Sequence, residues 1–121
     1  MWTFRINADG SLDAGAPTMA MRRPIDPAGE FRSQQPPPYK AEARGDGMTT
    51  DSLGRTYVTT ALGVQVFDPT GRLCGVVSAP QRDKEVISCV LSGAERAYLY
   101  VSSGATVHRR KVQASGVPRG S

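Results

Sequence analysis

Short apolar runs separated by turn residues recur along the chain from position 47 to position 112. The runs are rich in Val, Tyr and Thr, and Gly, Asp and Pro lie between them, which is the pattern of β-strands joined by tight turns. No segment shows the 3.6-residue period of a convincing helix. We therefore predict strands at residues 48–50, 56–59, 64–67, 72–78, 86–91, 97–101 and 106–112.

The N-terminal third of the chain has a different pattern. Residues 2–6 alternate apolar and polar side chains, as a half-buried strand does, and residues 7–10 (Asn-Ala-Asp-Gly) predict a tight turn. Residues 13–44 are rich in proline, which removes backbone donors and favours irregular backbone. We predict a long proline-rich loop over one end of a sheet, with a ligand for a proline-recognition module as the alternative.

The C-terminal residues 113–121 are mostly polar, and we predict that they form a flexible tail. Residues 117–121 (Val-Pro-Arg-Gly-Ser) resemble a thrombin-cleavage linker, with Gly116 at the position of the linker's leucine. No affinity tag follows this segment, so a natural tail is the favoured interpretation.

A strand-and-turn unit of about 43 residues occurs nearly twice. Residues 57–59 read Tyr-Val-Thr and residues 100–102, 43 positions later, read Tyr-Val-Ser; the same spacing aligns Met48 with Leu91. A period of about 40–45 residues built from four strands is that of one β-propeller blade. We predict an all-β fold, a partial β-propeller of about two to two and a half antiparallel four-stranded blades, in one domain over residues 1–112.

A propeller closes a ring of four to eight blades. Two blades alone leave open sheet edges, which invite pairing with other chains. We therefore expect either that further blades precede this chain in a longer protein, of which it is the C-terminal part, or that copies of it associate through the open edges.

The composition agrees with this architecture. Hydrophobic residues make up 39% of the 121, and 13 glycines with 9 prolines favour short strands and many turns over helical packing. No apolar run has the length of a membrane span, and no signal peptide is visible after Met1. We expect a soluble protein of the cytoplasm or periplasm, with no membrane partner.

The net charge is +4, and residues 108–111 (His-Arg-Arg-Lys) contribute much of it. No aromatic residues alternate with these basic ones, as a base-stacking platform requires, so we expect a solvated outer strand and no nucleic-acid partner. His108, the only histidine, would then be a surface residue. Cys74 and Cys89 lie in apolar runs, which predicts buried thiols, with a disulfide as the alternative; two thiols alone make no zinc site.

Three motifs follow one another in the middle of the chain. Residues 45–51 read Gly-Asp-Gly-Met-Thr-Thr-Asp, residues 54–60 read Gly-Arg-Thr-Tyr-Val-Thr-Thr, and residues 63–71 read Gly-Val-Gln-Val-Phe-Asp-Pro-Thr-Gly. In this order they resemble the senescence marker protein/gluconolactonase/luciferin-regenerating-enzyme-like family of regucalcin-type proteins. Residues 2–12 are similar to the end of the preceding blade and residues 99–112 to the closing blade, so the resemblance covers most of the chain outside the proline-rich loop.

The resemblance implies a six-bladed propeller that hydrolyses lactones, often sugar-derived ones, at a divalent metal ion at the top of its central channel. The aspartate of the Asp-Gly-Met motif, here Asp46, would be a metal ligand and the catalytic general base. The family's other ligands, a glutamate from an early blade and asparagines from middle blades, come from blades that this chain lacks. Asp51 matches a turn aspartate of the family, which implies a structural role. Ca²⁺ is the metal expected first, with Mg²⁺, Zn²⁺ or Mn²⁺ as alternatives.

The chemistry of the residues agrees with this role. Ca²⁺ and Mg²⁺ prefer oxygen ligands. A bound dication polarises a lactone carbonyl, and a carboxylate beside it can take a proton from the attacking water. An Asx turn before Gly47 is the structural alternative for Asp46. Ser88, at the start of the next inner strand, is a candidate for the same channel rim, with an ordinary strand serine as the alternative.

We therefore expect the C-terminal portion of a divalent-metal-dependent lactone hydrolase of the gluconolactonase type, which cleaves the carboxylic ester bond of a small lactone. The isolated 121 residues should be inactive because they lack most metal ligands. The alternative is a non-catalytic propeller module in which Asp46 is a turn residue and the proline-rich loop is the contact surface. The sequence offers no Ser-His-Asp arrangement and no phosphate-binding glycine loop.

Overall fold

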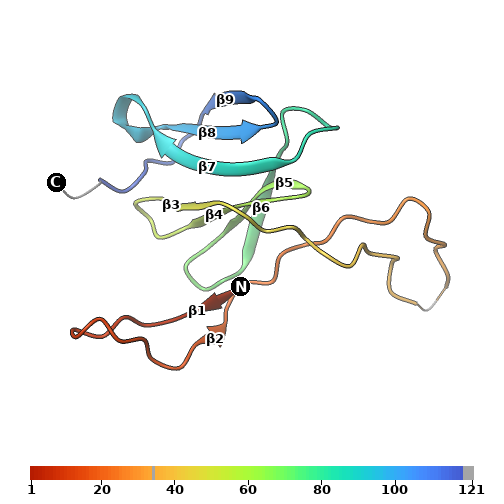
Figure 1. Ribbon diagram of the computed structural model, residues 1–121, viewed down its shortest axis with the longest axis horizontal. Helices are drawn as coiled ribbons and strands as arrows, with labels where there is room; N and C mark the ends of the chain where they lie inside the picture. Colours follow the sequence, from red (N-terminus) through yellow and green to blue (C-terminus); the bar gives the residue numbers. More distant parts are fainter. Residues whose placement is uncertain (34, 119–121) are drawn as a thin grey trace.

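The structure of the protein is a computed structural model that describes residues 1–33 and 35–118. Three antiparallel sheets lie one above another: a two-stranded ribbon, a four-stranded sheet and a three-stranded sheet (Figure 1). Their elements, in chain order, are β1 (Trp2–Thr3), β2 (Ala16–Pro17), β3 (Met48–Thr50), β4 (Thr56–Thr60), β5 (Gly63–Phe67), β6 (Leu73–Ser78), β7 (Val86–Ser92), the 3₁₀ turn η1 (Ala94–Arg96), β8 (Tyr98–Ser103) and β9 (Thr106–Lys111).

The two larger sheets are meanders in which each strand pairs with the next, in the orders β3-β4-β5-β6 and β7-β8-β9. They are the two blades that the repeat predicts, and the all-β, antiparallel, partial-propeller fold is confirmed. Within the described residues the second blade has three strands rather than four. The described chain contains no helix with the length and apolarity needed to cross a membrane.

A four-residue turn that begins with Asp or Asn and ends with Gly recurs at residues 7–10, 26–29, 51–54 and 68–71. In each turn the glycine N–H donates to the carbonyl oxygen of the first residue at 2.9 or 3.0 Å. Short polar side chains at the first position and glycine at the last favour this geometry. The turn at 7–10 is as predicted, and the one at 26–29 lies inside the predicted proline-rich loop.

The strand pairing corrects one alignment of the repeat. Val58 on β4 pairs with Met48, and its equivalent on β8, Val101, pairs with Cys89. Met48 therefore corresponds to Cys89 and not to Leu91, two residues further along. The pairings of β4 with β5 and of β8 with β9 do keep the 43-residue spacing. The inner hairpins differ because the paired residues Cys89 and Val101 are two positions further apart in sequence than Met48 and Val58 are.

The main hydrophobic core lies between the two blades. Its buried members are Tyr57, Val64, Val86, Cys89, Leu91, Leu99, Val101 and Ala114. Burial raises the pKa of the Cys89 thiol to about 11, so this thiol stays protonated near neutral pH. Cys74 is instead exposed on β6, and both cysteines are free. The prediction of buried thiols is thus right for Cys89 and wrong for Cys74, because β6 is an outer strand with mostly exposed side chains.

The inner strands of the two blades meet at one carbonyl group. The Gly47 N–H and the Thr59 hydroxyl both donate to the Ile87 carbonyl oxygen at 2.9 Å. A Cβ atom on Gly47 would lie 2.7 Å from the Ser88 Cα and 2.9 Å from the Ile87 oxygen. Glycine is therefore the residue that lets the two blades approach this closely.

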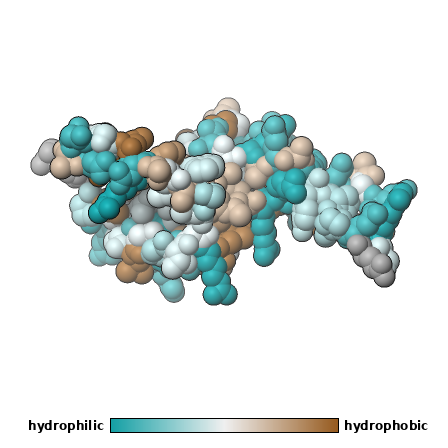
Figure 2. All heavy atoms as spheres, turned by 90° about the horizontal axis from the view of Figure 1, so that it is seen from below, coloured by the Kyte–Doolittle hydropathy of each residue, from teal (hydrophilic) through white to brown (hydrophobic). Residues whose placement is uncertain are grey.

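The N-terminal ribbon lies below the four-stranded sheet in Figure 1. Trp2 pairs with Pro17, and a single bridge joins Ile6 to Leu12. The strand predicted at 2–6 is therefore shorter, and its predicted half-burial is wrong, since Trp2 is 64% and Ile6 72% exposed. No sheet of the described chain covers the ribbon. On the face shown in Figure 2, hydrophobic residues form several separate patches between hydrophilic ones.

The loop predicted at residues 13–44 is partly organised by pairing. Its first residues contain β2, and a bridge joins Ile25 to Tyr39 in a part that extends away from the sheets (Figure 1). The buried Gln65 side chain anchors the loop to β5: its Oε1 accepts the Arg22 N–H and its Nε2 donates to the Arg22 carbonyl, both at 2.8 Å. The loop is thus attached to the sheet at a buried side chain.

The segment after β9 packs back onto the blades. The Ser52 N–H donates to the Ser115 carbonyl at 2.8 Å, and the Arg96 Nε donates to the Gly116 carbonyl at 2.9 Å. The backbone of this segment therefore joins turns of both blades, while the flexibility predicted for residues 113–121 stays a prediction. The predicted linker extends over residues 119–121, which lie outside the described residues.

Asp51 holds the turn between β3 and β4. Its buried carboxylate accepts the N–H groups of Leu53 and Arg55 at 2.9 and 3.0 Å, the Arg55 Nε at 2.6 Å and the Tyr57 hydroxyl at 3.1 Å. Burial opposes ionisation of Asp51, but these hydrogen bonds outweigh it and lower its pKa below the ordinary 3.8. Burial, and then the Asp51 charge, raise the pKa of Tyr57 to about 12, which keeps it a donor. The structural role predicted for Asp51 is confirmed by these contacts.

Replacing Gly47 by alanine should lower the free energy of unfolding by about 1–3 kcal/mol, because the added methyl group overlaps the Ser88 backbone. Urea denaturation measures this change. Gly75→Ala on β6 is the matched control, since no atom lies within 4 Å of its Cβ position, and it should change the free energy of unfolding by less than about 0.5 kcal/mol. Equal stability of the two variants would contradict the close approach of the blades.

The lowered pKa of Asp51 makes a pH-dependent contribution to stability. Its ionised form stabilises the folded protein above the ordinary pKa of 3.8, and this contribution is lost as the pH falls through the lower folded-state value. We expect the free energy of unfolding to decrease below about pH 4, and to decrease less in Asp51→Asn, as measured by urea denaturation at acidic and neutral pH. The same acid dependence in both proteins would refute the contribution of Asp51.

Candidate functional site

Asp46 lies just before β3, at the inner edge of the first blade. Its N–H donates to the Thr59 carbonyl at 3.1 Å, and the Gly47 carbonyl accepts the Thr59 N–H at 2.9 Å, so the β3–β4 pairing continues to this residue. Asp46 is exposed. Its carboxylate accepts no hydrogen bond from the residues that the structure describes, and the alternative of an Asx turn before Gly47 is therefore not what is observed. Hydrogen bonds thus hold the backbone at Asp46, while its carboxylate has no hydrogen-bond partner among the described residues.

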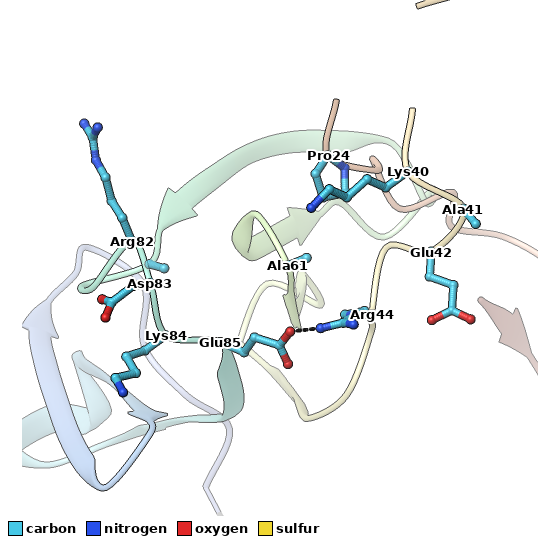
Figure 3. Close-up of a pocket in the computed structure, with 11 residues that line it drawn as sticks. Pro24, Lys40, Ala41, Glu42, Arg44, Ala61, Arg82, Asp83, Lys84 and Glu85 are labelled. Atoms are coloured by element: carbon cyan, nitrogen blue, oxygen red, sulfur yellow. Dashed lines mark hydrogen bonds and ion pairs between the residues drawn. The ribbon is translucent and has the colours of Figure 1, made fainter. Parts of the chain in front are cut away.

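Asp46 borders a hollow between the starts of the two inner strands. This hollow has a volume of about 140 Å³ and is lined by Arg44, Gly45, Asp46, Thr60, Ala61, Glu85, Val86 and Ile87. A larger hollow of about 470 Å³ adjoins it, with Arg44, Ala61 and Glu85 common to both (Figure 3). A small polar molecule that enters the larger hollow can therefore approach Asp46.

Arg44 and Glu85 point toward one another across these hollows and form an ion pair (Figure 3). The pair joins the segment before β3 to the segment before β7. Both side chains are more than half exposed, so solvent screens their attraction. Arg44 has a φ of 53°, in the left-handed region, where a residue other than glycine is strained. This strained residue lies two positions before Asp46 and restrains the path of the backbone toward it.

Ser88 lies on β7 against Gly47. Its hydroxyl is 2.9 Å from the Ser102 hydroxyl, and its N–H donates to that same oxygen at 3.1 Å. The structure thus brings Asp46 and Ser88 onto neighbouring inner strands. Ser88 does not line the hollow beside Asp46, and its hydroxyl is engaged within its own blade.

The oxygen donors at this hollow are too few for a complete cation site. Asp46 and Glu85 are its two carboxylates, and Glu85 is paired with Arg44. Among the described residues no three His, Cys, Asp or Glu side chains gather as a group that could hold a metal ion. Ca²⁺ takes six to eight oxygen ligands. The described residues can therefore offer a ligand, Asp46, but do not by themselves fit a metal ion.

His108 corrects a prediction made from the sequence. It is half-buried, and its Nε2 atom is buried rather than exposed on an outer surface. The reason is that His108 pairs directly with Val101 and shares the face of the sheet that packs on the first blade. The sequence also gave no reason to select Arg44 or Glu85, since no motif contains them as a pair; the only signal is that oppositely charged residues precede both inner strands.

The comparisons with known proteins identify this architecture. The family model of the SMP-30/Gluconolactonase/LRE-like region matches residues 5–105. The chain is also similar to the X-ray structure of a protein described as a suggested gluconolactonase, with 20% sequence identity and a TM-score of 0.57. That similarity covers 98% of this chain and 48% of the other chain, so the chain spans about half the length of that structure. No curated protein sequence matches at a significant level.

At this level of identity the structural likeness shows the shared fold alone, which agrees with the partial propeller described above. The family match is more specific, because it extends over most of the chain and includes the segment from Gly45 to Gly71 that carries the three motifs. The chain belongs to the SMP-30/gluconolactonase/LRE-like family.

Proposed function

We propose that the intact protein is a divalent-metal-dependent hydrolase of small lactones, of the gluconolactonase type, and that this chain supplies part of its active site. The observation that supports this proposal is the free carboxylate of Asp46 at a hollow between the inner strands of two blades. A purely structural turn aspartate would bind neighbouring N–H groups, as Asp51 does. Family membership supports the class of reaction.

In this proposal Asp46 acts as a general base. A carboxylate within hydrogen-bond reach of a water takes its proton while the water oxygen adds to the lactone carbonyl carbon. The tetrahedral intermediate then breaks its bond to the ring oxygen. The ring oxygen takes up a proton and becomes the hydroxyl group of the open-chain hydroxy acid.

We also propose that Asp46 is one of the metal ligands in the intact protein. The donor chemistry favours a hard dication, with Ca²⁺ expected first. The remaining oxygen ligands would come from outside the described residues, which is consistent with a chain that spans about half of the related structure.

A non-catalytic interaction module is the second candidate function. The observation that favours it is the exposed Pro36-Pro37 segment in the part of the loop that extends away from the sheets (Figure 1). Extended proline-rich segments are recognised by aromatic grooves of other proteins. In that case Asp46 would have no role in catalysis, and its replacement would leave the protein's function unchanged.

In the intact protein, Asp46→Asn should lower the turnover of gluconolactone by about a hundredfold or more, because the amide cannot accept the proton of the attacking water. Proton release in a pH-stat assay with Ca²⁺ present measures the rate. Asp13→Asn is the matched control, since it removes an exposed carboxylate on the N-terminal ribbon; it should keep the wild-type rate. Retained turnover in Asp46→Asn would refute the role of this residue.

The isolated 121-residue chain should bind Ca²⁺ no more tightly than about 1 mM, because one free carboxylate at the hollow cannot replace the hydration shell of the ion. Isothermal titration calorimetry at neutral pH measures the affinity. Micromolar affinity would show that this chain alone completes a site, in contradiction to the donor set described above.

A further inference from the structure

Another cavity lies between the two blades, lined by residues of β5, β6, β7, β8 and β9. Its volume is about 300 Å³, and it is lined by Val64, Val77, Ser78, Pro80, Val86, Leu99, Val101, His108, Arg109 and Arg110. Val86 is the one lining residue that it shares with the hollow beside Asp46. Close-packed protein interiors contain few spaces larger than a water molecule, whereas small-molecule sites have apolar walls and volumes of this order.

His108 brings a polar atom into this apolar wall. It pairs with Val101 across β8 and β9, so both side chains lie on the face of the sheet that borders the cavity. Its Nε2 atom is buried, and no group among the described residues forms a hydrogen bond with it. Buried polar atoms nearly always have a hydrogen-bond partner. His108 lines the cavity while its Nε2 atom is covered. A turn of the imidazole that exposes Nε2 to the cavity would let a bound molecule provide that partner.

The charged part of the lining is basic. Arg110 pairs with Leu99, which places it on the same face of β9 as His108. Arg109 points to the other face, where its guanidinium lies 5.4 Å from the centre of the Tyr98 ring. None of the described residues that line the cavity is acidic. The cavity therefore combines aliphatic walls, one imidazole nitrogen and an exposed guanidinium group at its rim.

We propose that this inter-blade cavity binds a small aryl or alkyl monocarboxylate. The apolar body of the ligand packs among the valines and Leu99, and its carboxylate lies between the His108 Nε2–H and the Arg110 guanidinium. An ammonium ligand would face arginine without a counter-charge. A polyhydroxylated sugar lactone would place its hydroxyl groups against aliphatic walls without hydrogen bonds, at a cost in free energy. The ligand class is therefore different from the substrate proposed for the Asp46 hollow.

The single histidine of the chain provides a direct probe of this cavity. Titration of phenylacetate into the 121-residue protein, at constant pH near neutrality, should shift the Hε1 and Hδ2 resonances of His108 to saturation. Nuclear Overhauser effects should connect the phenyl ring to valine methyl groups. Benzyl alcohol has the same ring without the carboxylate and should bind about tenfold more weakly, because it loses the charge-assisted hydrogen bonds.

Two variants test the roles of charge and space. Arg110→Gln should weaken phenylacetate binding about tenfold, and the matched control Lys111→Gln, an exposed β9 residue outside the lining, should bind as the wild type does. Val77→Phe should abolish binding by filling the cavity. If Val77→Phe does not fold, the phenylacetate affinity of Arg110→Gln still tests the proposal. A His108 signal that does not saturate with phenylacetate, or equal affinity in wild type and Arg110→Gln, would overturn the proposal.

Discussion

The carbonyl oxygen of Ile87 is the contact on which the arrangement of the two blades depends. It accepts the Gly47 N–H and the Thr59 hydroxyl, each at 2.9 Å. The Thr59 side chain is fully buried and also lies 3.1 Å from the Gly47 carbonyl, so a residue of β4 joins both inner strands. Because Gly47 follows Asp46 directly, this contact also fixes the point at which the candidate base leaves the sheet.

The same packing of one blade on the other produces two different chemical environments. At the inner edge, charged residues from the segments before β3 and β7 surround the hollow beside Asp46. On the outer side, aliphatic residues of β5, β6 and β8 enclose a cavity into which His108 brings the one imidazole of the chain. Side chains of a strand alternate between the two faces of its sheet. The two environments therefore differ because a different face and a different edge of each strand meet the neighbouring blade at each place.

Much of the fold could be predicted from the sequence because local signals agree with one another. Strands β3 to β9 combine β-forming residues with glycine- and aspartate-containing turns, and both signals are short-range. The residue of β7 that corresponds to Met48 of β3 could not be predicted, because Cys89 and Leu91 are both apolar and either can be aligned with Met48. The different burial of Cys74 and His108 could not be predicted either. Both residues lie on outer strands, and only tertiary packing decides which face of such a strand is covered.

The candidate site was predictable only in part. Asp46 is identified by the motifs that the chain shares with its family, whereas the Arg44–Glu85 pair forms only when two segments about 40 residues apart are brought together by the blades. The hydrogen bonds of the segment around Ser115 with both blades depend on the same long-range packing. The alternation of apolar and polar residues along one strand contains no information on contacts between distant segments.

We propose that Asp46 of the intact protein is a ligand of a catalytic cation. Anomalous diffraction from crystals of the intact protein grown with Ca²⁺ would locate this cation. We expect an anomalous peak about 2.3–2.6 Å from a carboxylate oxygen of Asp46, in the hollow between the two inner strands. A cation bound elsewhere, with the Asp46 carboxylate turned to solvent or hydrogen-bonded within its own turn, would contradict it.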